Sequence, residues 1–327
     1  MHPFAYRAAA SLQDAVAHAA RSPAAAYIAG GTDLIQLLQE NVAAPSEVID
    51  INGLPFAAIQ ADEAGLRIGA LVRMADLARH PAVQQGYPMI AEALLASASG
   101  QVRNAATIGG NLLQRTRCLY FRDHTTPCNR REPGSGCSAM EGVNRLNAIF
   151  GTSAHCIATH ASDLAVALVA LDARLRLAGP DGEREIALAE LHREPGDTPQ
   201  VETVLGRGEL ITEIIVPVSG FAAHGHYLKV RDRASFEWAL VSAAAALEVA
   251  DGKIRQARVA AGGVATKPWR LRQVEDALLG LPPTFESAQA AAERAGEGAS
   301  PRPGNAFKVE LLKRTVARAI ASAGARA

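Results

Sequence analysis

One stretch of the sequence, residues 107–163, constrains the fold more than any other because it contains all four cysteines of the chain. It begins with a small-residue loop at residues 107–111, whose glycines would let the backbone come close to a phosphate. Prolines and glycines interrupt residues 115–150, and an irregular segment of this length is uncommon in a compact domain unless it is functional or mobile. The first hypothesis is therefore that this stretch joins a nucleotide cofactor to a metal centre.

The four cysteines are separated by nine, eight and eighteen residues, and they are Cys118, Cys128, Cys137 and Cys156. No Cys-x-x-Cys pair is present, which argues against the common structural zinc sites, a thioredoxin-type motif and the tight ferredoxin runs. Four thiolates still meet the ligand requirement of a [4Fe–4S] cluster and of tetrahedral zinc. Disulfides and buried free thiols are the alternatives, although the neighbouring Arg, Asp, Gly and Pro residues make a poor apolar core.

Arginines are concentrated around the cysteines, at Arg115, Arg117, Arg122, Arg130 and Arg131. Because a cluster with four thiolates carries net negative charge, nearby arginines would offset that charge and raise the reduction potential. The alternative is a solvated basic loop, or one that docks on an acidic partner.

A second small-residue turn, Gly30-Gly31-Thr32-Asp33, follows an expected strand at residues 25–29 and precedes an expected helix at residues 34–39. This order points backbone N–H groups and the positive end of a helix at an anion. A turn of this kind alone is a weak signal, and it lacks the three spaced glycines of the dinucleotide fingerprint and the Walker lysine. Together with residues 107–111 it predicts a nucleotide site, provided that the two loops converge.

Periodicity and turn residues predict further elements along the chain. Strands are expected at residues 4–9, 47–51, 59–61, 66–69, 174–178, 210–217, 227–231, 241–250 and 254–262. Helices are expected at residues 12–20 with Ser11 as N-cap, and at 73–78, 89–98 with a C-cap at Ser99-Gly100, 165–171, 188–191, 274–279, 285–295 and 309–323. Residues 219–225 predict a boundary, after which a sheet carries helices on one face.

Composition excludes several classes of function. Hydrophobic residues make up 49% and charged residues 20% of the 327 residues, and the formal net charge is zero, so neither disorder nor a nucleic-acid partner is indicated. No apolar run reaches the roughly 18–20 residues of a membrane span, and the N-terminus lacks the pattern of a secretory signal. Catalytic motifs of hydrolases, such as His-Glu-x-x-His, are also absent.

Four motifs, in this order, closely resemble the FAD-binding subunits of the molybdenum hydroxylases, the xanthine dehydrogenase and aldehyde oxidoreductase family. They are Ala29-Gly30-Gly31-Thr32-Asp33-Leu34, Thr107-Ile108-Gly109-Gly110-Asn111-Leu112, Ser162-Asp163-Leu164 and Lys229. Arg117-Cys118-Leu119-Tyr120-Phe121-Arg122 and Pro133-Gly134-Ser135-Gly136-Cys137 resemble the subset with an extra [4Fe–4S] cluster, especially the FAD subunit of bacterial periplasmic aldehyde oxidoreductases. The similarity extends over nearly the whole chain.

The resemblance implies an α+β fold. A two-part FAD-binding domain of the PCMH (vanillyl-alcohol-oxidase-like) type would occupy residues 1–218, with a small N-terminal α/β part at 1–55. The larger α+β part, at 56–218, would carry the cysteine insertion at 115–157. A C-terminal domain of a small antiparallel sheet with helices would follow at residues 224–327.

The resemblance also implies residue roles. The FAD pyrophosphate would be held by Ala26, Tyr27, Ile28, Ala29, Gly30, Gly31, Thr32, Asp33 and Leu34 together with Thr107, Ile108, Gly109, Gly110 and Asn111. Asp163 would hydrogen-bond at the flavin side, Ile211 would also contact the cofactor, and Lys229 would lie near the flavin ring, where a cation favours the reduced anionic form. Cys118, Cys128, Cys137 and Cys156 would ligate the cluster, and no residue of this chain is assigned to substrate chemistry.

The partners implied by the resemblance form a heterotrimer. A small subunit would hold two [2Fe–2S] clusters and a large subunit the molybdenum cofactor, where substrate is oxidised; electrons would then reach FAD and an external acceptor. A self-contained flavin enzyme and a zinc-stabilised interaction module are the competing hypotheses. The complex would be periplasmic by co-export with a signal-bearing partner, or cytoplasmic.

Overall fold

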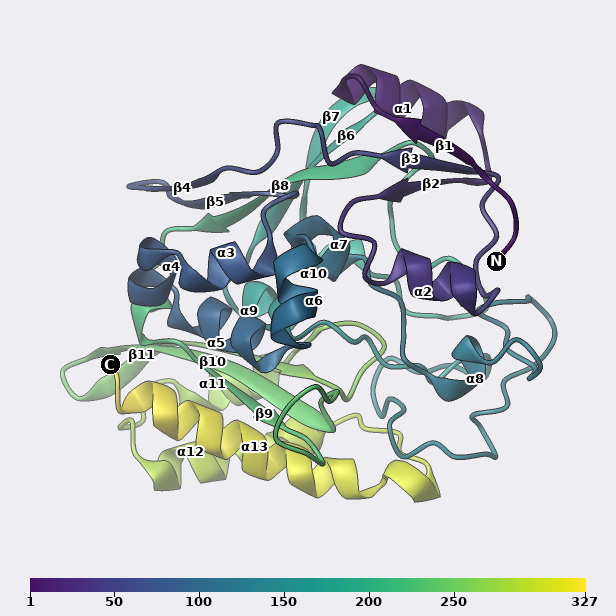
Figure 1. Ribbon diagram of the computed structural model, residues 1–327. Helices are drawn as coiled ribbons and strands as arrows, with labels where there is room; N and C mark the ends of the chain where they lie inside the picture. The colour runs from purple at the N-terminus through teal and green to yellow at the C-terminus, as the bar shows by residue number, and fades with distance from the viewer.

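The computed structural model describes residues 1–327 and contains three sheets with helices packed between and around them (Figure 1). The N-terminal sheet is parallel and has the order β1-β3-β2. Its elements are β1 (Ala5–Ala8), α1 (Leu12–Arg21), β2 (Ala25–Ile28), α2 (Leu34–Gln39) and β3 (Glu47–Asp50). Parallel strands need crossover connections, and α1 and α2 supply them. The Ser11 hydroxyl caps α1 as predicted, since it accepts a hydrogen bond from the Asp14 N–H at 3.1 Å.

The second sheet is antiparallel and has the order β4-β5-β8-β6-β7. Its strands are β4 (Ile59–Asp62), β5 (Gly65–Gly69), β6 (Arg174–Gly179), β7 (Gly182–Ala187) and β8 (Leu210–Pro217). The helices around it are α3 (Met74–Arg79), α4 (Pro81–Gly86), α5 (Pro88–Ala96), α6 (Gly100–Ala105), α7 (Ile108–Leu112), α9 (Asp163–Ala170) and α10 (Leu188–Leu191). Every residue of α9 is buried, so this helix forms the centre of the main core.

The third sheet is antiparallel, has the order β12-β11-β10-β9, and belongs to the C-terminal part of the chain. Its strands are β9 (His226–Val230), β10 (Val241–Ala250), β11 (Lys253–Gly262) and β12 (Trp269–Arg270). The turn between β10 and β11 has positive φ at both Asp251 (55°) and Gly252 (67°), which is the geometry of a two-residue hairpin loop. The accompanying helices are α11 (Arg272–Leu278), α12 (Phe285–Ala292) and α13 (Phe307–Gly324). Short 3₁₀ turns lie at Ala222–His224, Glu293–Gly296 and Pro303–Asn305.

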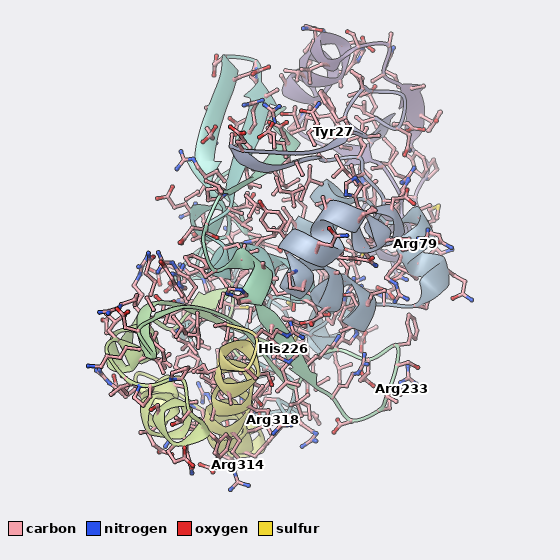
Figure 2. The ribbon with its side chains drawn as sticks, turned by 90° about the vertical axis from the view of Figure 1, so that its left-hand side faces the viewer. Tyr27, Arg79, His226, Arg233, Arg314 and Arg318 are labelled. Carbon is pink, nitrogen blue, oxygen red and sulfur yellow. The ribbon has the colours of Figure 1, made fainter.

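Helices cover both faces of the C-terminal sheet, whereas the sequence predicted helices on one face (Figure 1). Ala243 and Ala245 of β10 pack with α11, α12 and α13 in one core. Ala244 and Ala246, which point the other way, belong to the main core together with α5 and α9. On its outer side α13 presents Arg314 and Arg318 to solvent (Figure 2). On the other face of the sheet, His226 at the start of β9 lies 3.0 Å from the Glu92 carboxylate of α5.

The α+β fold class is confirmed, and α2, α10 and β8 have the predicted bounds. Two local predictions are wrong. Residues 107–111 were expected as a loop, but Thr107 is the N-cap of α7, a short helix. Ser99 does not end α5; its hydroxyl accepts from the Val102 N–H at 3.3 Å and so begins α6. No helix of the structure combines the length and the hydropathy needed to cross a bilayer.

Candidate functional site

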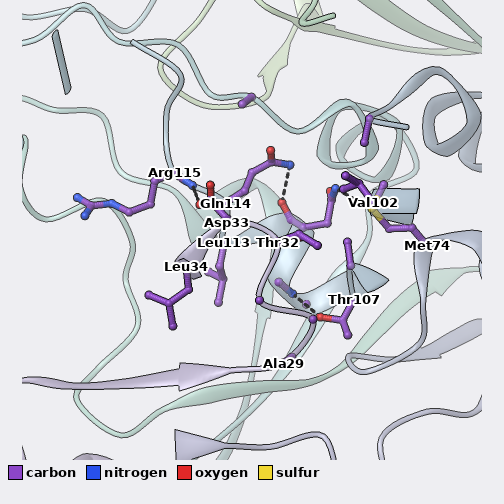
Figure 3. Close-up of a pocket in the computed structure, with 18 of the residues that line it drawn as sticks. Ala29, Thr32, Asp33, Leu34, Met74, Val102, Thr107, Leu113, Gln114 and Arg115 are labelled. Atoms are coloured by element: carbon purple, nitrogen blue, oxygen red, sulfur yellow. Dashed lines mark hydrogen bonds between the residues drawn. The ribbon is translucent and has the colours of Figure 1, made fainter. Parts of the chain in front are cut away.

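A cavity of about 590 Å³ lies where the N-terminal sheet, the five-stranded sheet and the C-terminal part of the chain meet (Figure 3). We call it the central cavity. Both predicted small-residue motifs line it, so the two segments converge in space as the nucleotide hypothesis required. All of the predicted cofactor residues except Ala26, Ile108 and Lys229 contribute to its lining.

The turn between β2 and α2 presents a row of unused backbone donors to the central cavity. The N–H groups of Gly30, Gly31, Thr32 and Asp33 donate no hydrogen bond within the chain. Gly31 has φ +71°, and a Cβ on Gly30 would lie 2.1 Å from the Ala105 carbonyl oxygen. Consecutive free N–H groups in a turn with a left-handed residue form an anion-binding concavity. This turn is therefore suited to phosphate oxygens.

The second motif contributes differently. The N–H groups of Ile108 and Gly109 donate to the carbonyls of Val72 and Ala70, at 2.9 and 2.8 Å, and are not available to a ligand. The Gly110 N–H points at the Thr107 hydroxyl at 3.3 Å. A Cβ on Gly109 would lie 3.0 Å from the Ala70 Cβ, so the glycine lets α7 pack closely against the end of β5. The motif thus supplies a smooth wall rather than a set of free donors.

A buried ion pair borders the other side of the central cavity. The Asp163 carboxylate, at the first turn of α9, accepts hydrogen bonds from Ser97 Oγ (2.8 Å), Tyr227 OH (2.5 Å) and Lys229 Nζ (2.8 Å). Burial and the neighbouring Asp163 charge raise the pKa of Tyr227 well above its usual value, so the phenol stays a donor. Lys229 does not line the cavity, because its ammonium group is taken up by Asp163 and the Ala96 carbonyl.

Two side chains in the lining, one basic and one aromatic, were not predicted from the sequence to contact the cofactor. The Arg117 guanidinium lies 4.5 Å from the centroid of the Trp238 ring, and both side chains line the central cavity. Burial lowers the pKa of Arg117. Trp238 lies in the connection between β9 and β10, where no motif marks it, so its position follows only from the packing of the C-terminal part on the rest.

Asp33 connects the first small-residue turn to residues 115–157, which we call the cysteine loop. Its carboxylate accepts a hydrogen bond from the Arg115 backbone N–H at 2.8 Å (Figure 3). The guanidinium groups of Arg117 and Arg122 each lie 2.8 Å from the same carboxylate. Asp33 thus anchors the beginning of the cysteine loop, and its side chain is not free to contact a ligand on its own.

The cysteine loop contains one short helix, α8 (Leu119–Arg122). The loop brings its four cysteines to the wall of one small cavity of about 10 Å³, which we call the cysteine cavity. All four are free, so the disulfide alternative is not realised. Asn147 Nδ2 donates to Cys118 Sγ at 3.5 Å, and the Ala158 N–H donates to Cys156 Sγ at 3.4 Å. Burial raises the pKa of the Cys118 and Cys137 thiols.

The thiols do not form a preassembled site for a single metal ion. The structure has no group of three or more His, Cys, Asp or Glu side chains close enough to hold one. The four cysteines come from separate positions and line one cavity, and the sulfurs of Cys118 and Cys156 each accept an N–H hydrogen bond, which is compatible with the chemistry of a cluster site. The predicted ligand set stays a prediction.

Comparison with known proteins decides the family. Residues 2–219 match the FAD binding domain in molybdopterin dehydrogenase, and residues 226–323 match the CO dehydrogenase flavoprotein C-terminal domain. The chain is 48% identical to the aldehyde oxidoreductase FAD-binding subunit PaoB of Escherichia coli (strain K12) over 100% of both chains. This chain belongs to the FAD-binding subunits of the molybdenum hydroxylases.

More distant members of this family of FAD-binding subunits share the whole architecture. The carbon monoxide dehydrogenase medium chain of Hydrogenophaga pseudoflava is 28% identical over 99% of this chain and 98% of its own length. The structure of quinoline 2-oxidoreductase from Pseudomonas putida 86 superposes with a TM-score of 0.76 at 25% identity, covering 99% of each chain. The predicted family is confirmed, and its FAD-binding domain supports FAD as the cofactor; the comparisons do not bear on the cysteines.

Proposed function

We propose that this chain is the electron-transfer subunit of a molybdenum-dependent aldehyde oxidoreductase, with FAD in the central cavity and a [4Fe–4S] cluster on the cysteine loop. It would form a heterotrimer with a molybdenum-cofactor subunit and a [2Fe–2S] subunit, and pass their electrons to an external acceptor. Full-length similarity to an aldehyde oxidoreductase FAD-binding subunit supports the aldehyde as substrate class. Relatives described as medium chains or medium subunits support the assembly.

The observation that carries the proposal is that the four thiols line one cavity in a loop attached directly to the central cavity. Asp33 belongs to the phosphate-binding turn and also receives the Arg115 N–H, at the start of the cysteine loop. Phe121 of α8 is fully buried against Leu37 of α2 and Cys128. Arg115, Arg117 and Arg122 of the same loop line the central cavity, so a cluster held by this loop would be attached to the wall of the FAD site.

The residues that would hold FAD follow from the geometry of the central cavity. Gly30 to Asp33 would donate their free N–H groups to the pyrophosphate. Trp238 and Arg117 would present an aromatic and cationic surface. Asp163, held in place by the Tyr227 hydroxyl and the Lys229 ammonium group, would present a fixed carboxylate. When bound, FAD supplies the exchange of electrons between one-electron and two-electron carriers.

The residues that would hold the cluster are the four cysteines with their N–H donors. Hydrogen bonds to sulfur and the nearby Arg130 charge stabilise additional electron density and so raise a reduction potential. A cavity of about 10 Å³ has room for roughly one water. Loading of a cluster would therefore be coupled to a change in the conformation of the loop.

Anaerobic purification followed by absorption spectroscopy and by iron, sulfide and zinc analysis tests the proposal. Flavin bands with broad absorbance that dithionite bleaches are expected. Colourless protein with one zinc per chain would support the interaction module, and aldehyde oxidation by this chain alone would support the self-contained flavin enzyme.

We expect Cys128→Ser to lose the iron–sulfur absorbance while keeping part of its FAD. Val143→Ala, at a position 67% exposed in the same loop, is the control and should keep both cofactors. A full complement of iron and sulfide in Cys128→Ser would refute the ligand assignment.

A further inference from the structure

A line of hydrogen bonds and ion pairs runs from the phosphate-binding turn to the cysteine cavity, and Glu202 is at its centre. Asp33 accepts from the Arg115 N–H at 2.8 Å, and Arg115 Nε donates to Glu202 Oε1 at 2.8 Å. The other carboxylate oxygen, Glu202 Oε2, lies 3.1 Å from Arg130 Nη1. Arg130 in turn lines the same small cavity as Cys156 and the other three cysteines. One carboxylate therefore holds an arginine from each end of the path.

Glu202 is held in place by its own backbone. It lies in the connection between α10 and β8, outside every motif of the sequence. Its carbonyl accepts from the Arg193 N–H at 2.9 Å, and the neighbouring Thr203 forms a bridge with His192. Its side chain is 20% exposed and that of Arg130 only 7%. A fixed carboxylate of this kind can transmit the position of one arginine to the other.

We propose that Glu202 is a positioning residue that couples the two cofactor sites. Through Arg115 it fixes the segment that Asp33 holds, and through Arg130 it fixes the cationic group beside Cys156. The inference rests on the proposed function, since it requires both FAD and a cluster in this chain. Coupling between sites is reciprocal, so loading the cluster strengthens FAD binding by the factor by which FAD strengthens retention of the cluster.

Charge explains why this carboxylate matters more than an ordinary surface ion pair. Without the Glu202 carboxylate, Arg115 and Arg130 carry like charges and share no counter-ion. Such a loss is costly for Arg130 because its side chain is buried. Arg130 would then be free to turn, and the Asp33–Arg115 contact would lose its support. Changes to such supporting residues around metal sites typically cost about 10- to 100-fold in affinity or activity.

The test uses Glu202→Gln in the intact complex, with the dissociation constant of FAD measured by fluorescence before and after removal of iron by a chelator under reducing conditions. Iron removal should weaken FAD binding about tenfold in the natural protein and little in the variant. The reduction potential of the cluster should change in the variant, because Glu202 no longer offsets the Arg130 charge or fixes its position beside the cysteines. Glu194→Gln, which removes an ion pair with Lys267 in the same connection, is the matched control and should behave as the natural protein.

The results that would overturn this inference are distinguishable from those that would overturn the proposed function. Two results refute the role of Glu202 and leave the proposed function standing. The first is that the iron-loaded natural protein binds FAD equally well before and after iron removal. The second is that the variant has the same ratio of FAD dissociation constants before and after iron removal, and the same cluster potential, as the natural protein. Natural protein that never contains iron or sulfide refutes the proposed function and the coupling with it. A variant that only unfolds at lower temperature, with ratio and potential unchanged, shows a purely structural role.

Discussion

The central cavity and the cysteine cavity are built in opposite ways. The turn that faces the central cavity is held between a strand and a helix, and its binding groups are backbone N–H donors. The cysteine loop is held mainly by side chains: Arg131 donates to the Tyr120 and Phe121 carbonyls at 2.7 and 2.9 Å, and Asn129 donates to the His155 carbonyl at 3.1 Å.

This difference has consequences for stability. A backbone site is present whenever the sheet is folded, since its donors need no side chain to be ordered. A site that depends on side-chain hydrogen bonds in a long loop must overcome the conformational entropy of that loop. A bound metal centre contributes that free energy directly. We therefore expect the central cavity to keep its structure without FAD. The cysteine loop should need its bound cluster to stay folded.

The largest effect should come from closing the backbone site. In Gly30→Ala the new Cβ would lie 2.1 Å from the Ala105 carbonyl oxygen, so the turn must shift, at a cost of about 3 kcal/mol in unfolding free energy. We expect FAD to be lost, as measured by flavin content and chemical denaturation. Gly53→Ala is the control, because a Cβ added at Gly53 would have no neighbouring atom within 4 Å. Normal flavin content in Gly30→Ala would show that the turn does not contact the cofactor.

Asp33→Asn tests whether the two sites are joined. It removes the charge that Arg117 and Arg122 share, at a position 17% exposed, and we expect a loss of about 2 kcal/mol in stability. Both flavin and iron content should fall. Asp76→Asn, which loses only a 3.5 Å contact with Arg79 from a side chain 63% exposed and lies outside the central cavity, should change neither. Loss of flavin with full iron content would show that the sites are independent.

After iron is removed from the natural protein, the cysteine loop and the elements around the central cavity should differ in their rates of amide hydrogen exchange. Residues 115–157 should exchange at least about tenfold faster, equivalent to about 1.4 kcal/mol, while β8 and α9 keep their protection. The physical reason is that the loop has only one short helix of its own. Uniform acceleration across the chain would contradict the comparison.

The smallest effect concerns pH and the far anchor of the cysteine loop. Lys308 of α13 is fully buried and donates to the Asn147 and Gly263 carbonyls at 3.0 and 2.6 Å. Burial, with a contribution from Arg145, lowers its pKa to about 7 from 10.5. Above pH 7 the unfolded chain holds a proton that the folded chain lacks, so stability should rise with pH, by about 1 kcal/mol between pH 7 and pH 8. Lys308→Met should abolish this slope in urea denaturation, and an unchanged slope would exclude Lys308 as its origin.

Local sequence signals predicted the turn between β2 and α2 because a strand, two glycines and a helix follow one another within a few residues. The same logic failed at residues 107–111, where Thr107 caps a helix in spite of two glycines, since tertiary bonds to Val72 and Ala70 fix it. Cysteine spacing could suggest a shared site but could not show that the thiols face one cavity. Trp238 and Glu202 were missed because their roles depend on contacts with residues distant in the sequence.

The C-terminal sheet has a consequence for the order of events during biosynthesis. Residues 226–323 match a separate domain family, the CO dehydrogenase flavoprotein C-terminal domain. Ala244 and Ala246 of this domain nevertheless lie in the same core as α5 and α9. Phe236, Glu237 and Trp238 also form part of the central cavity. The ribosome must therefore release most of the last third of the chain before this wall exists. FAD bound in this cavity would accordingly be loaded only after the C-terminal part has been made, and neither half of the chain alone would offer the complete cavity.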